Sequence, residues 1–196
     1  SGGMKQRIGI DNLDDYEHLV KFVDTVAKTG CQTFVVHARI AILAGLSPKE
    51  NREIPPLRYD VPERLKREHP ELTVILNGGI KTVPQVREWL PKFDGVMIGR
   101  QVYHEPYLLA ELDANFLGPG FVPPSRELVV DRYADYVERM LAEGHRLPLM
   151  LRHIHGLFAG LPNARAWRCY LTEHAIQPGA GPEVLRDSLR LFRNAA

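Results

Sequence analysis

The chain has 196 residues, of which 44% are hydrophobic and 25% are charged, the ordinary composition of a soluble globular protein. This composition argues against collagen-like, disordered and disulfide-scaffold proteins, and no apolar run is long enough for a membrane span. The formal net charge of +1 provides no global attraction to nucleic acids. Because Cys31 and Cys169 lack the spacing of a zinc site or a disulfide framework, we expect a cytoplasmic protein without a metal site.

The first 113 residues repeat one pattern, in which a short apolar strand is followed by a loop and an amphipathic helix. Strands are predicted at Lys5–Ile10, Thr33–Val36, Thr73–Leu76 and Gly95–Ile98. Helices are predicted at Asp14–Thr29, Val61–His69, Val83–Leu90 and Val102–Asp113. The last three strands are too apolar for one-sided exposure, which is typical of buried parallel strands. Four βα units predict an α/β fold, half of a TIM-type barrel, and the alternative is an open doubly wound sheet.

Residues 114–125 are rich in glycine and proline and are predicted to form a linker. No strand pattern returns after the linker. Helices are predicted at Leu128–Leu141, Leu149–Phe158, Ala164–His174 and Pro182–Asn194. The sequence therefore predicts a small all-helical domain over residues 126–196. Its ten basic residues are all arginine and stand against eight acidic residues, which suits phosphate contacts, although a general arginine bias explains the composition equally well.

Glycines follow the third and fourth predicted strands, where the functional loops of a barrel begin. Gly78, Gly79 and Gly99 have no Cβ, so their backbone N–H groups can approach an anion closely. Arg100 adds a positive charge beside them. These residues predict a site for the phosphate tail of a cofactor, and ordinary tight turns are the alternative.

Two cationic or titratable residues, Lys5 and His37, are predicted at the ends of the first two strands. A lysine there can neutralise charge that develops on an electron-rich cofactor, and a histidine can donate to the cofactor or shuttle a proton. A solvated lysine and a structural histidine are the alternatives. The following loop, Ala38–Leu57, is about twenty residues long, and loops of that length are usually functional or disordered. Its second half offers Lys49, Glu50, Asn51 and Arg52, for which substrate contact is predicted, and a solvated charged loop is the alternative.

In the helical domain, Arg165 and Arg168 are three residues apart and share one face of a predicted helix. Trp167 lies between them and is more typical of a core residue than of a stacking platform. A basic helix face near an active site suits a long polyanionic substrate such as RNA.

Several of these motifs together resemble the tRNA-dihydrouridine synthases. The resemblance rests on KQRIGID, on HAR with the AGLSPKENREIPPL loop, on NGGI and on GVMIGR. The loop and the later segment LFAGLPNARAWRCYL resemble the A type, which acts on uridines 20 and 20a of the tRNA D-loop. The likeness extends from Lys5 to about Leu191, nearly the whole chain.

The resemblance implies an FMN-binding barrel followed by a helical tRNA-binding domain. NADPH reduces the flavin in this family, hydride passes to C6 of the uracil, and a cysteine protonates C5. By motif, the resemblance assigns FMN contacts to Lys5, His37, Asn77, Gly78, Gly79, Gly99 and Arg100. It assigns tRNA contacts to Lys49, Arg52, Arg165 and Arg168.

The chain also departs from the family pattern. The family's barrel has a first half that this chain lacks, and that half carries the catalytic cysteine in an Asn-Val-Gly-Cys-type motif. Neither Cys31 nor Cys169 has that setting. We therefore expect the C-terminal portion of an enzyme, inactive alone and self-associating through the open edges of its sheet. A half-barrel of another FMN or phosphate-binding enzyme and a non-catalytic RNA-binding fragment are the alternatives.

Overall fold

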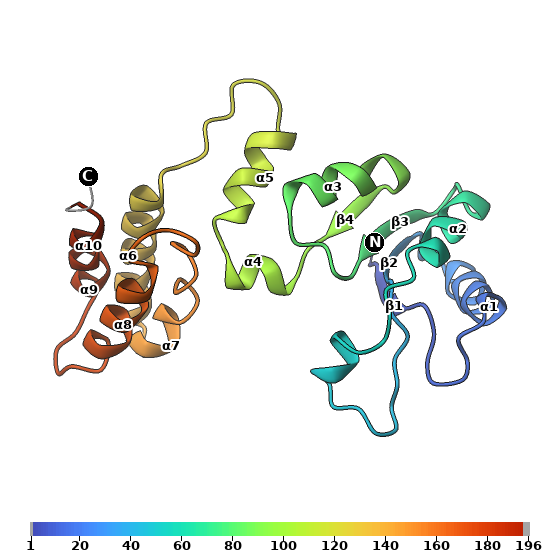
Figure 1. The fold of residues 1–196 in the computed structure, drawn as a ribbon, viewed down its shortest axis with the longest axis horizontal. Coiled ribbons are helices and arrows are strands. Elements are labelled where there is room, and N and C mark those ends of the chain that lie inside the picture. The colour runs from blue at the N-terminus through green and yellow to red at the C-terminus, as the bar shows by residue number, and fades with distance from the viewer. Residues whose placement is uncertain (1, 194–196) are drawn as a thin grey trace. The chain divides into compact units, whose positions relative to one another are not determined.

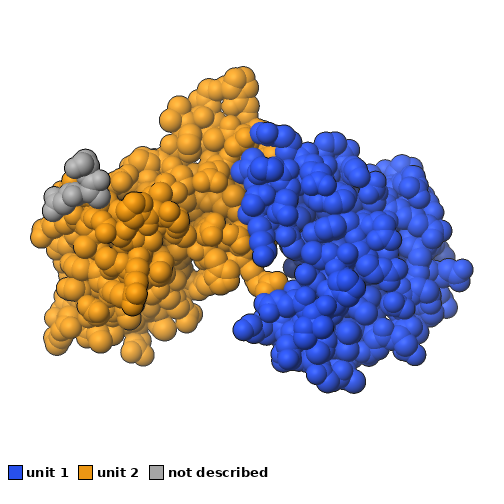
Figure 2. All heavy atoms as spheres, in the orientation of Figure 1, with its two compact units in different colours: residues 1–98 blue, residues 99–196 orange. Residues whose placement is uncertain are grey.

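The computed structural model describes residues 2–193 and divides after Ile98 into two compact units (Figures 1 and 2). The first unit contains all four strands, and the described residues of the second unit are helices, turns and loops. The segment Val102–Asp113, which was predicted as the last helix of the βα domain, therefore falls in the second unit. The predicted domains, residues 1–113 and 126–196 with a linker at 114–125, stay a prediction.

The first unit is built on one parallel sheet in the order β1-β2-β3-β4 (Figure 1). Its strands are β1 (Met4–Arg7), β2 (Thr33–His37), β3 (Thr73–Asn77) and β4 (Gly95–Met97). The α/β class is confirmed. The sequential order is that of half a TIM-type barrel, and it argues against a doubly wound sheet, in which the strand order reverses. The predicted first strand is too long, because the chain leaves β1 after Arg7.

Three helices of the first unit follow the strands, as the sequence predicted: α1 (Tyr16–Ala27), α2 (Asp60–Glu68) and α3 (Val83–Trp89). Short 3₁₀ turns occupy Glu50–Arg52 (η1) and Leu90–Lys92 (η2). The side chain of Asp15 accepts a hydrogen bond from the backbone N–H of His18 and starts α1. Thr82 caps α3 in the same way, with Pro84 in the first turn. The apolar core of the unit includes the fully buried Phe34, Val36, Leu65, Val74 and Leu76.

The second unit begins with two short helices where the sequence predicted one. They are α4 (Arg100–His104) and α5 (Leu108–Phe116). The prediction of a single helix over Val102–Asp113 is wrong because Pro106 has no N–H and pushes Glu105 out of the helical region, to φ −134° and ψ 75°.

The remaining helices are α6 (Arg126–Ala142), α7 (Leu147–Leu151), α8 (Ala164–His174), α9 (Glu183–Ser188) and α10 (Arg190–Arg193). The predictions of α6 and α8 are confirmed. The helix predicted at Leu149–Phe158 is wrong beyond Leu151, where the chain continues in turns. A Cβ on Gly156 would overlap the carbonyl oxygen of His104, so this turn segment needs a glycine to pack on α4. The helix predicted at Pro182–Asn194 is two helices, and Asn194 lies outside the described residues.

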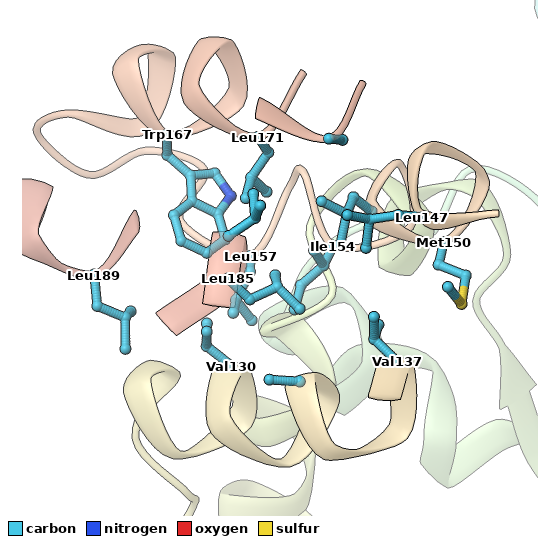
Figure 3. Packing of buried hydrophobic residues seen from close by; sticks show 14 of the residues in the cluster. Val130, Val137, Leu147, Met150, Ile154, Leu157, Trp167, Leu171, Leu185 and Leu189 are labelled. Atoms are coloured by element: carbon cyan, nitrogen blue, oxygen red, sulfur yellow. The ribbon is translucent and has the colours of Figure 1, made fainter. Parts of the chain in front are cut away.

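Side chains from α6, α7, α8 and α9 meet in one apolar core (Figure 3). Trp167 is fully buried there and packs against Phe158 and Phe192, with ring centroids 4.7 Å and 5.9 Å away. The second unit thus has a core of its own, which is what a separately folding helical lobe requires. None of the helices within residues 2–193 is long and apolar enough to cross a membrane.

Candidate functional site

The C-terminal edge of the sheet carries one row of polar side chains. Arg7 of β1 pairs with His37 of β2, and His37 pairs with Asn77 of β3. Because side chains alternate along a strand, Lys5 projects from the same face as Arg7. The other face carries the fully buried Phe34, Val36, Val74 and Leu76. The polar row therefore belongs to the face that lines the interior of a TIM-type barrel, at the end where such barrels carry their active sites.

Asn77 is the most buried member of this row, with 7% of its surface exposed. Its side-chain nitrogen donates to the carbonyl of Met97 in β4 over 2.8 Å. Its backbone carbonyl accepts from the N–H of Ala38, the residue after β2, also over 2.8 Å. Asn77 thus joins three neighbouring chain segments and fixes the geometry of the turn that follows it.

That turn contains Gly78 and Gly79, with φ values of 117° and 72°. A Cβ on Gly79 would lie 2.5 Å from Leu57 Cδ1 and 2.9 Å from Tyr59 Oη, and the Tyr59 hydroxyl donates to the Gly78 carbonyl over 2.7 Å. Both glycines are therefore needed by the backbone and by the packing of the preceding loop. The N–H groups of Gly78 and Gly79 donate no hydrogen bond to any of residues 2–193. Consecutive amides of this kind can bind an anion such as phosphate.

Arg7 is a member of the row that the sequence prediction missed. Its Nη1 donates to the carbonyls of Ile40 and Asn51, over 2.7 Å and 2.8 Å. Burial lowers the pKa of Arg7, and the positive charges of Arg39 and Arg52 lower this pKa further. Arg39 and Arg52 are the sequence neighbours of Ile40 and Asn51, whose carbonyls Arg7 binds, so three arginines come from adjoining segments near the edge of the sheet. The available signal was the spacing, because Arg7 lies two residues after Lys5 and therefore on the same strand face.

The loop after β2 carries two of the predicted RNA contacts. Lys49 precedes η1, Arg52 is its last residue, and both side chains are exposed. Arg7 attaches the loop to the sheet through its bonds to the carbonyls of Ile40 and Asn51. Within the loop, Arg39 Nε donates to the Pro55 carbonyl over 2.7 Å. Lys49 and Arg52 are thus presented on a loop that is tied to the polar edge.

The other two predicted RNA contacts, Arg165 and Arg168, lie exposed on α8 while Trp167 between them points into the core. Neither arginine forms an ion pair within residues 2–193, in contrast to Arg186, which lies 2.7 Å from Asp135. Burial lowers the pKa of His155, and the charge of Arg168 lowers it further.

Gly99 and Arg100 begin the second unit and are exposed. A Cβ on Gly99 would meet nothing within 4 Å, so packing gives no reason for a glycine there. An open backbone at this position suits close approach of a ligand. The structure thus brings four of the predicted cofactor residues together along one edge of the first unit, His37, Asn77, Gly78 and Gly79, and places Lys5 two residues before the edge on the face that carries Arg7. Gly99 and Arg100 belong to the second unit, and their role in phosphate binding stays a prediction.

The sheet order and the polar row at its C-terminal edge define an α/β protein of the TIM-barrel type. A profile of the family described as "Dihydrouridine synthase (Dus)" matches residues 3–193. The chain belongs to this family.

Curated relatives extend the comparison. The chain is 52% identical over 192 residues to a protein of Pseudomonas aeruginosa named tRNA-dihydrouridine(20/20a) synthase. This alignment covers 98% of this chain and 56% of the relative. A protein of the same name from Shewanella oneidensis is 51% identical, over 93% of this chain and 55% of the relative. One from Vibrio cholerae is 49% identical, over 95% of this chain and 57% of the relative. The chain therefore spans about half the length of the curated relatives it matches.

Proposed function

We propose that this chain is the C-terminal portion of a flavin-dependent oxidoreductase that reduces uridine to dihydrouridine in the D-loop of tRNA. The family match supports the reaction, and the names of the relatives support positions 20 and 20a. The observation that carries the proposal is the edge of the sheet. A row of Arg7, His37 and Asn77 ends beside two glycine amides that have no acceptor within residues 2–193, and Lys5 lies on the same strand face as Arg7.

The residues at this edge fit FMN, with NADPH as the reductant. When bound, FMN would supply the hydride that adds to C6 of the uracil. The ammonium group of Lys5 would neutralise negative charge on the reduced ring, and His37 would hold the ring in place. The amides of Gly78 and Gly79 would bind the phosphate. The resemblance assigns phosphate contacts to Gly99 and Arg100 as well. Asn77 would fix the turn through its bond to Met97.

The cationic side chains outside the row fit tRNA. Lys49, Arg52, Arg165 and Arg168 are exposed, and their charges match phosphate oxygens. Phosphate contacts position a nucleic acid without reading its sequence. We therefore assign to these residues the placement of the tRNA, and to the sheet edge the chemistry on the base.

The cofactor assignment is tested by titrating the purified chain with FMN and with riboflavin, which lacks the phosphate, and following flavin fluorescence. We expect weak binding of FMN, little flavin in the purified protein, and still weaker binding of riboflavin. Lys5→Met should weaken the binding of both flavins, because Lys5 is assigned to the ring. Equal affinities for FMN and riboflavin would contradict the phosphate role of Gly78 and Gly79. A folded protein that binds neither flavin would contradict the cofactor assignment itself.

A further inference from the structure

The loop that carries Lys49 and Arg52 runs over about twenty residues between β2 and α2 (Figure 1). Backbone hydrogen bonds hold residues 47–54 in turns and Ala41 against the segment after β1, but within residues 2–193 none joins Ile42 or Leu43 to η1. The connection across this part of the loop comes from side-chain hydrogen bonds. Asn51, which lies in η1 between the two cations, forms most of these bonds.

The side chain of Asn51 binds both polar groups of one peptide segment on the opposite side of the loop. Its Oδ1 accepts from the N–H of Ile42 over 2.7 Å, and its Nδ2 donates to the carbonyl of Ile42 over 2.6 Å. Longer bonds run from Nδ2 to the carbonyls of Leu46 and Ser47, at 3.3 Å and 3.4 Å. One half-buried amide thus closes the loop across nine residues of sequence.

The backbone of Asn51 is fixed to the sheet as well. Its carbonyl accepts from Nη1 of Arg7, the last residue of β1, and the same nitrogen donates to the carbonyl of Ile40. The hydrogen bonds from Arg7 to Asn51 and from Asn51 to Ile42 therefore connect the polar edge of the sheet to both sides of the loop. The neighbouring bond between the Ser47 N–H and Glu50 is local and exposed, and it does not reach the sheet.

We propose that Asn51 is a positioning residue for RNA binding, which holds Lys49 and Arg52 in place relative to the edge formed by Arg7, His37 and Asn77. The inference rests on the proposed function, because it assigns the two cations to RNA phosphates. Without Asn51, the loop and its long side chains are ordered only when RNA binds, and this ordering weakens the complex. The affinity for tRNA falls by about 5- to 150-fold, which corresponds to ordering two long side chains on binding.

The test compares tRNA binding by the wild type, Asn51→Ala and Asn51→Asp at low salt. Asn51→Asp preserves shape and the Oδ1 acceptor, but it places a carboxylate oxygen against the carbonyls of Ile42, Leu46 and Ser47. Asn12→Asp, at an exposed position of the same unit, is the control for the added negative charge. We expect a loss of affinity in both Asn51 variants that clearly exceeds the loss in Asn12→Asp. Affinities at the level of this control would overturn the proposal.

A double-mutant cycle separates positioning from a general structural effect. In a background with Lys49→Ala and Arg52→Ala, the change Asn51→Ala should cost almost no further affinity, because the side chains that it positions are absent. Additive losses would overturn the proposal. If the double variant Lys49→Ala/Arg52→Ala itself binds like the wild type, the assignment of the loop to RNA fails instead.

Amide hydrogen exchange without RNA provides an independent readout and works even where the affinity is low. The N–H of Ile42 should exchange faster in Asn51→Ala, which removes its acceptor, while the amides of β2 and β3 keep their protection. Unchanged protection at Ile42 would overturn the proposal. Faster exchange throughout the sheet would show that Asn51 stabilises the whole unit, and it would also overturn a specific positioning role.

Discussion

The guanidinium group of Arg126 lies over the ring of Tyr107, with Cζ 3.7 Å from the ring centroid. Nε of Arg126 also donates to the carbonyl of Leu157 over 2.9 Å, and the Tyr107 hydroxyl donates to the carbonyl of Pro124 over 3.0 Å. These contacts join the chain just before α5, the end of the predicted linker, the start of α6 and the turns after α7. The glycine- and proline-rich segment is therefore tied at its C-terminal end to the helical core.

We expect Arg126→Ala to destabilise the second unit. The variant removes a charge-assisted hydrogen bond, worth about 1.5–3 kcal/mol, and a cation–π contact worth about 0.5–1 kcal/mol. The free energy of unfolding of this unit should fall by roughly 2–4 kcal/mol in urea denaturation followed by circular dichroism. Arg132→Ala, at an exposed position of α6, is the matched control and should have little effect. Similar losses in the two variants would contradict the role given to Arg126.

Replacing Gly79 tests whether the turn after β3 requires glycine. Gly79→Ala places a side chain at φ 72° and 2.5 Å from Leu57, so it adds a steric clash to the backbone strain. Gly30→Ala is the matched control, because Gly30 also has a positive φ, 94°, but has nothing within 4 Å of a Cβ. Gly79→Ala should cost about 1–3 kcal/mol more in the free energy of unfolding than Gly30→Ala. Equal costs would mean that Leu57 moves aside freely.

The strands and the main helices could be predicted from the sequence because their signals are local. Thr82 and Pro84 start α3 where helix-start preferences place them, and the apolar runs gave the strands within a few residues. The break at Pro106 was also local, and the helical periodicity on both sides concealed it. The turn at Gly156 could not be predicted, because its cause is the His104 carbonyl, which lies about fifty residues earlier in the chain.

The same distinction applies to the candidate site. His37 and Asn77 could be placed on one edge from strand order alone, since the C-terminal ends of parallel strands lie together. The role of Arg7 and the bonds of Asn51 within the loop were not predicted, because they depend on Ile40 and Ile42, on the other side of a long loop. The sequence shows such residue types, but it does not show which carbonyl groups they bind.

Neither cysteine has the sequence setting of the family's proton donor, and Cys31 is also poorly placed for that role at the sheet edge. Cys31 lies just before β2, six residues from His37, which at strand spacing places it about 20 Å from the polar row. Cys169 is exposed on α8 in the second unit. We therefore expect no dihydrouridine when the purified chain is incubated with tRNA, FMN and NADPH and the nucleosides are analysed by mass spectrometry. Product formation that is abolished by Cys31→Ser would contradict this assignment.

We also expect the chain to self-associate through the open side of β1. Within residues 2–193, β1 pairs only with β2, and a groove of about 480 Å³ lies beside it. Ile10, Leu13 and Phe22 line this groove and are 40%, 45% and 44% exposed. Edges and apolar surfaces of this kind favour pairing with another chain.

Light scattering at micromolar concentration should show a dimer or a larger assembly. Phe22→Lys should shift the protein toward monomer, because it places a charge in the apolar groove. Ile176→Lys adds the same charge at a 70% exposed position of the second unit and should leave the assembly unchanged. A wild-type chain that is monomeric throughout the concentration range would show that the groove does not bind a second copy.

The arginines of α8 should carry much of the affinity for tRNA. Arg165 and Arg168 are exposed and form no ion pair within residues 2–193, so their charges are available to phosphates. Replacing both with alanine removes up to two phosphate contacts. Each lost contact should reduce the slope of log affinity against log salt by about 0.9. Each well-formed contact should also cost roughly 1.5–3 kcal/mol in binding free energy at low salt.

The matched control is Arg186→Ala/Arg190→Ala, which removes the same charge from the same unit. These arginines are bound to Asp135 and Asp187, each over 2.7 Å, so their loss should affect the salt slope less. Both double variants are compared with the wild type by fluorescence binding of tRNA across a salt series. If the two pairs have equal effects, net charge governs the interaction and the specific assignment of Arg165 and Arg168 fails. If neither pair has an effect, the helical unit does not contact the RNA.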